Sequence, residues 1–271
     1  MTTDSTRHIA SRENPDFRVW MKLSQGRGGR GAALLEGQHL CEAWCEAQGM
    51  PDMLIVGEAA QTLPWVQSLW IRCASARRVV LQDSLARELS RVEQGPAVFC
   101  IVRPPAPELP PEIHESCLCL DRVQDPGNLG TLLRTAAAAG LRQIFLSTGC
   151  VQAWAPKVLR SGQGAHFVLA IHERVELPEL FERLAVPLAV TTLDRADSLY
   201  ALDLRGPCAW LFGNEGQGVA PQWQTRATRR VRIPQAPQVE SLNVAAAAAI
   251  CLFEQRRQQL STSSDPGPLR P

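Results

Sequence analysis

The sequence has little net charge, no long apolar run and no paired cysteine motif. Its 28 Lys and Arg residues are balanced by 27 Asp and Glu, so the 271-residue chain has a formal net charge of +1. This excludes a histone-like protein that coats nucleic acid, although a local basic patch could still bind RNA. No apolar run reaches the roughly 18 residues of a membrane span, and the N-terminus lacks the apolar core of a signal peptide. We therefore expect a cytoplasmic protein with no membrane contact.

The nine cysteines form no C-x-x-C pair, and most lie in apolar runs. Their odd number and placement predict free thiols in a reducing compartment rather than a disulfide framework. The spacing closest to a metal site is Cys41 and Cys45, one helical turn apart, with His39 nearby. Because no second group of ligands follows, we expect these residues to share one helix face and no metal to bind.

The first 30 residues are locally basic, with six Lys or Arg against three acids, and they end in the sequence G-R-G-G-R-G at residues 26–31. This composition predicts a basic arm over residues 1–31 that ends in a flexible loop, in which Arg27 and Arg30 could contact a phosphate backbone. A loop that only faces solvent fits the residues equally well.

A proline-rich stretch divides the chain. Five of the nine residues at 103–111 are Pro, which excludes a helix or a central strand there. We expect a linker at 104–111 between an N-terminal α/β domain (1–103) and a C-terminal α/β domain (112–260), followed by a disordered tail (261–271). In the C-terminal domain, strands alternate with helices, which predicts a parallel sheet covered on both faces.

The expected N-terminal strands cover residues 32–37, 53–56, 78–81 and 97–102, with helices over 38–49, 63–73 and 84–92, the last capped by Asp83. The expected C-terminal strands cover 117–120, 143–146, 167–171, 188–193, 209–212 and 231–233. The expected C-terminal helices cover 128–140, 156–163, 178–184 and 242–258.

A first polar motif follows the strand at 117–120. Asn128 is suited to cap the next helix, and Arg134 lies nearly two turns further along it. The pair could face one site at the carboxyl end of the strand, where open α/β sheets bind ligands. A capped helix with a surface Arg is an equally good interpretation of these residues alone.

A second motif, G-N-E-G-Q-G at 213–218, follows the apolar strand at 209–212. Gly213, Gly216 and Gly218 would let the backbone approach a ligand closely. Their spacing matches neither the dinucleotide fingerprint nor a P-loop, so a phosphate-rich nucleotide is not indicated. A plain turn would not explain why the carboxylate of Glu215 stands between the glycines.

A third motif begins at Ile233 and Pro234, where a strand ends. After a loop, Ser241 is predicted to cap an Ala-rich helix, with Asn243 beside it. The helix start is a favourable place for anions and polar ligands. Capping accounts for Ser241 but not for Asn243.

In this order, the three motifs resemble the SpoU (TrmH) family of RNA ribose 2′-O-methyltransferases, within the SPOUT superfamily. The N-x-G-x-x-x-R motif is matched by Asn128, Gly130 and Arg134, the glycine motif by residues 213–218, and the I-P…S-L-N-V motif by residues 233–234 and 241–244. The resemblance covers about 117–258. A looser similarity to the family's substrate-binding domain rests on Asn14-Pro15, Arg30 and Leu35-Glu36-Gly37.

The resemblance implies a C-terminal domain with a deep trefoil knot, S-adenosylmethionine as cofactor, no metal, and a homodimer in which Arg134 acts beside the partner's cofactor site. It implies cofactor binding by Gly213, Gly218, Ile233 and Leu242, and catalysis by Arg134, Asn128, Glu215, Ser241 and Asn243. RNA is the implied substrate, with rRNA favoured. A tRNA enzyme and a non-catalytic RNA-binding protein of the same fold are the alternatives.

Two departures from the family pattern concern the third motif. Gln235 and Pro237 stand where the family has Met and Gly, and Ala245 stands where it often has Ser. Pro237 fixes its φ and lacks an N–H, so one backbone contact to the cofactor could be lost.

Overall fold

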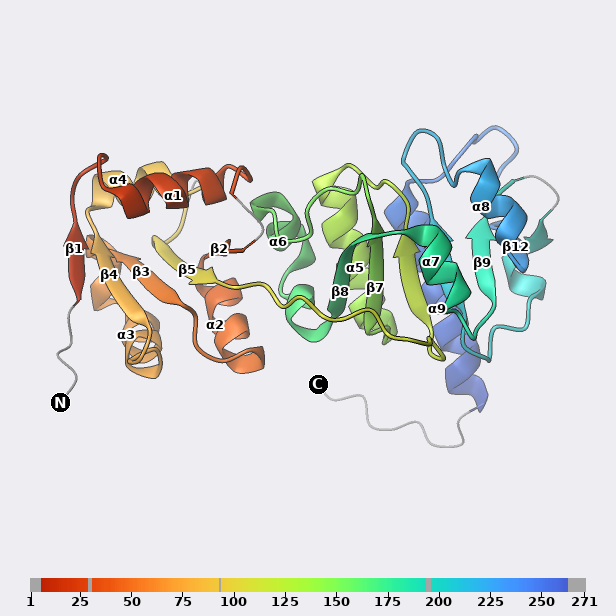
Figure 1. Cartoon of the computed structure of the whole chain (residues 1–271), viewed down its shortest axis with the longest axis horizontal. Coiled ribbons are helices and arrows are strands. Elements are labelled where there is room, and N and C mark those ends of the chain that lie inside the picture. The colour runs from red at the N-terminus through yellow and green to blue at the C-terminus, as the bar shows by residue number, and fades with distance from the viewer. Residues whose placement is uncertain (1–5, 29–30, 93, 194–195, 263–271) are drawn as a thin grey trace. The chain divides into compact units, whose positions relative to one another are not determined.

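The computed structural model describes residues 6–28, 31–92, 94–193 and 196–262 (Figure 1). Within these ranges, no helix is long and apolar enough to cross a membrane. The chain forms two compact units. Unit 1 comprises Met1–Pro105 and Trp154–Phe167, and unit 2 comprises Ala106–Ala153 and Val168–Pro271. The first division therefore lies inside the proline-rich stretch.

Unit 1 is built on a mixed sheet with the strand order β1-β4-β3-β5-β2. The strands are β1 (Arg7–Ile9), β2 (Ala33–Glu36), β3 (Met53–Gly57), β4 (Arg77–Leu81) and β5 (Val98–Val102). The pairs β1–β4 and β4–β3 are parallel, whereas β5 is antiparallel to β3 and to β2. The helices are α1 (Pro15–Ser24), α2 (Gln38–Ala47), η1 (Glu58–Thr62), α3 (Pro64–Arg72) and α4 (Asp83–Leu89).

The pleat of β3 explains why helices cover both faces of this sheet. Leu54 and Val56 point into a core shared with α2 and α3, whereas Met53 and Ile55 point into a second core shared with α1 and α4. Successive side chains of a strand alternate between faces, so an uninterrupted apolar run needs two apolar covers.

The described part of the basic arm contains a strand and a helix, neither of which was expected from the sequence. β1 pairs with β4, and Asn14 caps α1 by accepting hydrogen bonds from the N–H groups of Asp16 and Phe17. Phe17 and Trp20 of α1 are buried in the core. The many basic residues of this stretch made the amphipathic helix hard to predict from the sequence. Several of them form ion pairs in or near the helix: Arg7–Asp16, Arg12–Glu88 and Arg18–Glu13.

A short segment from the middle of the chain completes unit 1. It carries α6 (Pro156–Gly162) and most of η2 (Ala165–Val168), where the sequence predicted a strand from residue 167. The rings of Trp154 and Phe167 lie 6.1 and 5.4 Å from that of Trp44, both nearly perpendicular to it. The Gln48 side-chain amide also donates to the Phe167 carbonyl at 2.9 Å. The continuous domain predicted for 112–260 did not anticipate this insertion.

Unit 2 contains a sheet with the order β10-β12-β9-β11-β6-β7-β8 in its described residues, and every neighbouring pair is parallel, as predicted. The strands are β6 (Cys117–Leu120), β7 (Gln143–Ser147), β8 (Ala170–Val175), β9 (Leu188–Thr191), β10 (Asp197–Ser198), β11 (Ala209–Phe212) and β12 (Arg229–Arg232). The helices are α5 (Pro126–Ala139), α7 (Leu177–Glu182), η3 (Leu199–Ala201), α8 (Pro221–Arg226) and α9 (Val244–Thr262).

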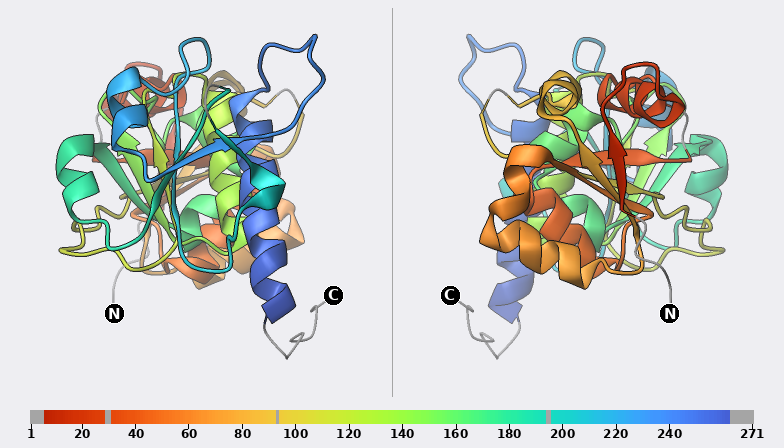
Figure 2. Two further views of the ribbon diagram at one scale, coloured as in Figure 1. Left: turned by 90° about the vertical axis from the view of Figure 1, so that its right-hand side faces the viewer. Right: turned by 90° about the vertical axis from the view of Figure 1, so that its left-hand side faces the viewer.

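Both faces of this sheet are covered. Leu177 and Leu180 of α7 pack with Val190 and Leu211 on one side. On the other, α9 runs alongside α5 (Figure 2), and the buried indole of Trp210 donates to Gln255 of α9 at 2.8 Å. From β6 the chain runs outwards through β7 and β8, and it then crosses to β9 on the other side of β6, so the strand order reverses between β6 and β11. Such a switch point is where open α/β sheets bind ligands.

Gln255 ties α9 to the sheet. It is buried, accepts from Trp210, and donates to the Ser116 hydroxyl and the Gly206 carbonyl. We expect Gln255→Leu to lower the free energy of unfolding by about 1–3 kcal/mol, because the indole N–H loses its acceptor. Trp210→Phe combined with Gln255→Leu removes that donor as well, so the double variant should lose less than the sum of the singles. Additive losses in denaturant unfolding would contradict this role.

Candidate functional site

Three loops meet at the carboxyl ends of β6, β11 and β12. Residues 121–125 connect β6 to α5, residues 213–220 connect β11 to α8, and residues 233–243 connect β12 to α9. β11 and β6 are neighbours in register, with Phe212 opposite Leu120. All three motifs found in the sequence are therefore brought to one edge of the sheet.

The loop after β11 turns back closely on itself. A Cβ atom at Gly213 would lie 2.1 Å from the Gly218 carbonyl oxygen and 2.3 Å from the Val219 nitrogen, so only glycine fits. Asn214 holds the turn: its Oδ1 accepts from the N–H groups of Gly216 (3.0 Å) and Gln217 (3.1 Å). Gly213 permits this close approach of the loop to itself, and Gly218 has a φ of 65°, which favours glycine. The close approach of the glycines to a ligand stays a prediction.

Glu215 joins this loop to the start of α5. Its carboxylate accepts hydrogen bonds from the backbone N–H groups of Gln124 (3.3 Å) and Asp125 (3.0 Å) and from the Asn128 side-chain amide (3.2 Å). Burial raises the pKa of Glu215, but the N–H of Asp125 and the other donors outweigh it, so the net pKa lies below its usual value. The carboxylate form is the one the site holds.

Asn128 extends this connection to the third loop. Its Oδ1 accepts from Nδ2 of Asn243 at 2.9 Å, while Asn243 Oδ1 accepts from the N–H groups of Ala245 (2.9 Å) and Ala246 (3.3 Å). Glu215, Asn128 and Asn243, from three separate motifs, thus form one chain of hydrogen bonds.

Two caps predicted at this site are wrong, as is the cap predicted at Asp83, which is the first residue of α4 and follows the cap residue Gln82. Asp125, not Asn128, caps α5 by accepting from the Asn128 N–H at 2.8 Å, because Pro126 occupies the first helical position. Asn243, not Ser241, caps α9, which begins at Val244. The side chain of Asn128 is thereby left for Glu215 and Asn243.

Arg134 lies exposed on α5, and no hydrogen bond or ion pair holds it among the residues that the structure describes. Ser241 is exposed in the loop before α9, and Arg27 is exposed in unit 1. Arg30 lies outside the described residues. Neither Asn128 nor Glu215 forms a hydrogen bond or ion pair with Arg134 in the described structure.

A cavity of about 360 Å³ opens beside the glycine loop. Gly213, Gly218, Ile233 and Leu242, the predicted cofactor-binding residues, all line it, and so do Glu215 and Ser241. Its volume lies within the range of small-molecule sites. The only charged residues that line it are Glu215 and Glu240, and no Lys or Arg contributes to its described wall.

Part of the cavity wall was not predicted from the sequence. Thr191, Thr192 and Leu193, at the end of β9, and Gln224 of α8 line the same cavity. No motif marks them, although the parallel order of β9, β11 and β12 could have placed the end of β9 here. Gln235 also lines the cavity and donates to the Val239 carbonyl at 2.8 Å, whereas Pro237 is exposed.

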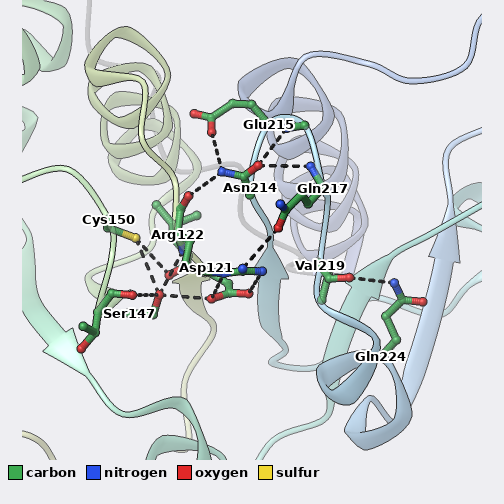
Figure 3. A network of polar contacts seen from close by, with 12 residues as sticks. Asp121, Arg122, Ser147, Cys150, Asn214, Glu215, Gln217, Val219 and Gln224 are labelled. Carbon is green, nitrogen blue, oxygen red and sulfur yellow. Dashed lines mark hydrogen bonds and ion pairs between the residues drawn. The ribbon is translucent and has the colours of Figure 1, made fainter.

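Arg122, which the sequence also missed, links the cavity to β6 and β7 (Figure 3). Its guanidinium bonds the buried Asp121 carboxylate through two nitrogens at 3.3 Å and the side chain of Gln217 in the glycine loop at 3.3 Å. Its carbonyl accepts from Asn214, and its N–H donates to Ser147. Arg122 has a φ of 55°, which is costly for a non-glycine residue. These five contacts hold it there.

In the described parts of the chain, no group of three or more His, Cys, Asp or Glu residues could hold a metal ion. The residues that line the cavity are mainly glycines, residues with hydroxyl, amide or carboxylate side chains, and apolar residues.

Comparisons with known proteins identify the family of this chain. The model of the SpoU rRNA Methylase family matches residues 115–253. An uncharacterized tRNA/rRNA methyltransferase of Synechocystis is 36% identical over 97% of this chain and 98% of its own length. The 23S rRNA (guanosine(2553)-2'-O)-methyltransferase of Bacillus subtilis is 31% identical over 92% of this chain and 99% of its own.

Among solved structures, the AdoMet-bound rRNA methyltransferase of Sinorhizobium meliloti superposes with a TM-score of 0.82 and 26% sequence identity. The match covers 93% of this chain and 98% of that protein. The similarity therefore includes both units.

The close approach at Gly213 can be tested by thermal and denaturant unfolding. Gly213→Ala should cost about 1–3 kcal/mol of stability, because the new methyl group overlaps backbone that cannot move alone. Gly206→Ala is the matched control, since a Cβ there meets no atom within 4 Å. Equal stability of the two variants would contradict the packing described for this loop.

Proposed function

The chain belongs to the SpoU rRNA methylase family, and we propose that it transfers a methyl group from S-adenosylmethionine to a ribose 2′-hydroxyl of ribosomal RNA. The observation that carries the proposal is the meeting of all three motifs: a cavity beside the glycine loop, the hydrogen-bonded chain of Glu215, Asn128 and Asn243, and the exposed Arg134 on the same helix as Asn128.

The cavity fits S-adenosylmethionine by its charge. Among the described residues that line it, two are charged and both are carboxylates, and this favours a cationic sulfonium over a polyphosphate. Apolar side chains such as Phe212, Ile233 and Leu242 provide surface for the adenine ring. We assign cofactor binding to Gly213, Gly218, Ile233 and Leu242, which all line the cavity.

When bound, S-adenosylmethionine supplies an electrophilic methyl group on a sulfonium that leaves as a neutral thioether. What the protein must add is a deprotonated or partly deprotonated 2′-hydroxyl, held in line with that methyl group. The exposed polar residues at the rim of the cavity are the groups available for this task.

Arg134 is the residue we assign to the hydroxyl. A guanidinium keeps its proton in proteins, so it acts as a fixed cation rather than as a base. It can bind the phosphate next to the target ribose through two N–H groups and stabilise the negative charge that develops on the 2′-oxygen. The lack of an intramolecular partner among the described residues leaves its donors free for RNA.

Ser241 and Asn243 are assigned to orienting the ribose. Asn128 and Glu215 are positioning residues, since their contacts are to other protein groups: Glu215 fixes Asn128, which in turn fixes the amide of Asn243. This positioning role explains why the glycine motif contains the carboxylate of Glu215, which binds protein groups and not a phosphate ligand.

The RNA assignment follows the relatives. The similar Bacillus subtilis enzyme is a 23S rRNA 2'-O-methyltransferase, which supports rRNA over tRNA and over a non-catalytic role. Arg27, exposed beyond the end of α1, is proposed to contact the RNA backbone, together with Arg30 and Arg134. We also propose the trefoil knot of the family, a homodimer with Arg134 acting at the partner's cofactor site, and a cytoplasmic location.

Replacement of Arg134 tests the assignment of this cation. Arg134→Ala should lower kcat for methyl transfer by about 10²–10³-fold, because the developing oxyanion loses its charge partner. Cofactor affinity, measured by calorimetry, should be unchanged. Arg142→Ala is the control, since Arg142 is exposed at the amino end of β7, away from the site. Turnover of Arg134→Ala equal to that of the control would refute the role.

The target atom is tested with RNA that carries a single 2′-deoxynucleotide at the modified position. Methyl transfer should stop, because the acceptor oxygen is absent. Continued incorporation of label at that nucleotide would indicate methylation of a base instead.

The contact of Arg122 with Gln217 predicts an energetic coupling. Arg122→Ala and Gln217→Ala should each weaken S-adenosylmethionine binding about fivefold, since either change frees the loop that lines the cavity. The double variant should be no weaker than either single variant. Multiplicative losses in the binding titrations would show that the two residues act separately.

A further inference from the structure

The nine thiols of the chain differ sharply in access to solvent. Seven are buried, and only Cys45 and Cys150 are partly exposed. No step of the proposed methyl transfer uses either of them, and they lie in different units, Cys45 in unit 1 and Cys150 in unit 2. Their surroundings differ as well, and this difference identifies one of them as reactive.

Cys45 has a second thiol beside it. It lies in the last turn of α2, and its Sγ is 3.6 Å from Sγ of Cys73, which directly follows α3. α2 and α3 cover the same face of the sheet in unit 1 and share one apolar cluster, in which Cys73 is fully buried. One accessible thiol therefore stands in contact with one protected thiol, on two helices already packed together.

The surroundings also favour the thiolate of Cys45. The hydrogen bond from Cys73 lowers the pKa of Cys45 to about 7, opposed by partial burial and by Glu42 and Glu46, and supported by the nearby Arg72 guanidinium. The pKa of Cys73 is raised by the same hydrogen bond and by burial, so this thiol keeps its proton. Burial raises the pKa of Cys150, which leaves it a neutral thiol at pH 7.

We propose that Cys45 is an oxidative modification site that reacts with hydroperoxides, and that Cys73 resolves the oxidised product as an intrachain disulfide. An accessible thiolate next to a second thiol is the arrangement of thiols that oxidise reversibly. Cys41 and Cys100, two other cysteines of unit 1, are both buried, so neither offers an accessible thiol.

The reaction balances with hydrogen peroxide as the oxidant. The Cys45 thiolate attacks one peroxide oxygen, the O–O bond breaks, and Cys45 becomes a sulfenic acid as hydroxide leaves and is protonated to water. Cys73 then attacks the Cys45 sulfur, the S–O bond breaks, and a second water leaves with the Cys73 proton. Two thiols and one peroxide give one disulfide and two waters, and an external thiol reverses the change.

The reactivity of Cys45 is tested on the full chain by alkylation with iodoacetamide and peptide mass spectrometry. At pH 7, Cys45 should be labelled roughly tenfold faster than Cys150, because about half of it is thiolate. Its labelling rate should rise with pH around a midpoint near 7. Equal labelling of the two thiols, or a midpoint at the ordinary cysteine value, would overturn the proposal.

Oxidation is tested next with stoichiometric hydrogen peroxide. The native chain should give a Cys45–Cys73 linked peptide that dithiothreitol releases. Cys73→Ser should instead stop at a Cys45 sulfenic acid that dimedone traps, and Cys150→Ser should behave as the native chain does. A native chain that accumulates sulfinic acid at Cys45 without the linked peptide would contradict the resolving role of Cys73.

Discussion

The site depends on the hydrogen bonds that the carboxylate of Glu215 accepts. This carboxylate stands in the loop after β11, yet its hydrogen bonds run to the backbone before α5 and to Asn128, which bonds Asn243 at the start of α9. Three segments that are remote in sequence are thereby held at one edge of a parallel sheet. Because these donors favour the ionised form, charge-assisted hydrogen bonds tie the loop to α5, in addition to the apolar packing of Val219.

This arrangement separates two kinds of surface. The cavity beside the loop has acidic and neutral walls, which suit a cationic cofactor, whereas the exposed Arg134 on α5 suits a phosphate backbone. The net charge of +1 averages over these regions and says nothing about either. A methyl transfer from a sulfonium to a nucleic acid needs both surfaces near each other, with polar side chains between them.

Much of the fold could be predicted from the sequence because short apolar runs bounded by Gly and Pro mark buried strands. The parallel sheet of unit 2 is confirmed. The helix α1 was missed, because only Phe17, Trp20 and Leu23 bury its inner face and a charged residue stands between each and the next. The two caps were assigned wrongly, since Asp125 and Asn128, or Ser241 and Asn243, are equally good capping residues until the helix start is known. The contacts of Trp154, Phe167 and Arg122 are long-range and leave no local pattern.

The central claim, 2′-O-methylation of ribosomal RNA by this site, is tested most directly by mapping 2′-O-methyl groups in total RNA from cells with and without the protein. The account predicts that a ribosomal RNA position loses its methyl group without the protein and regains it with the native chain, but not with Arg134→Ala. An unchanged ribosomal pattern together with a methyl group lost from a transfer RNA would contradict the account.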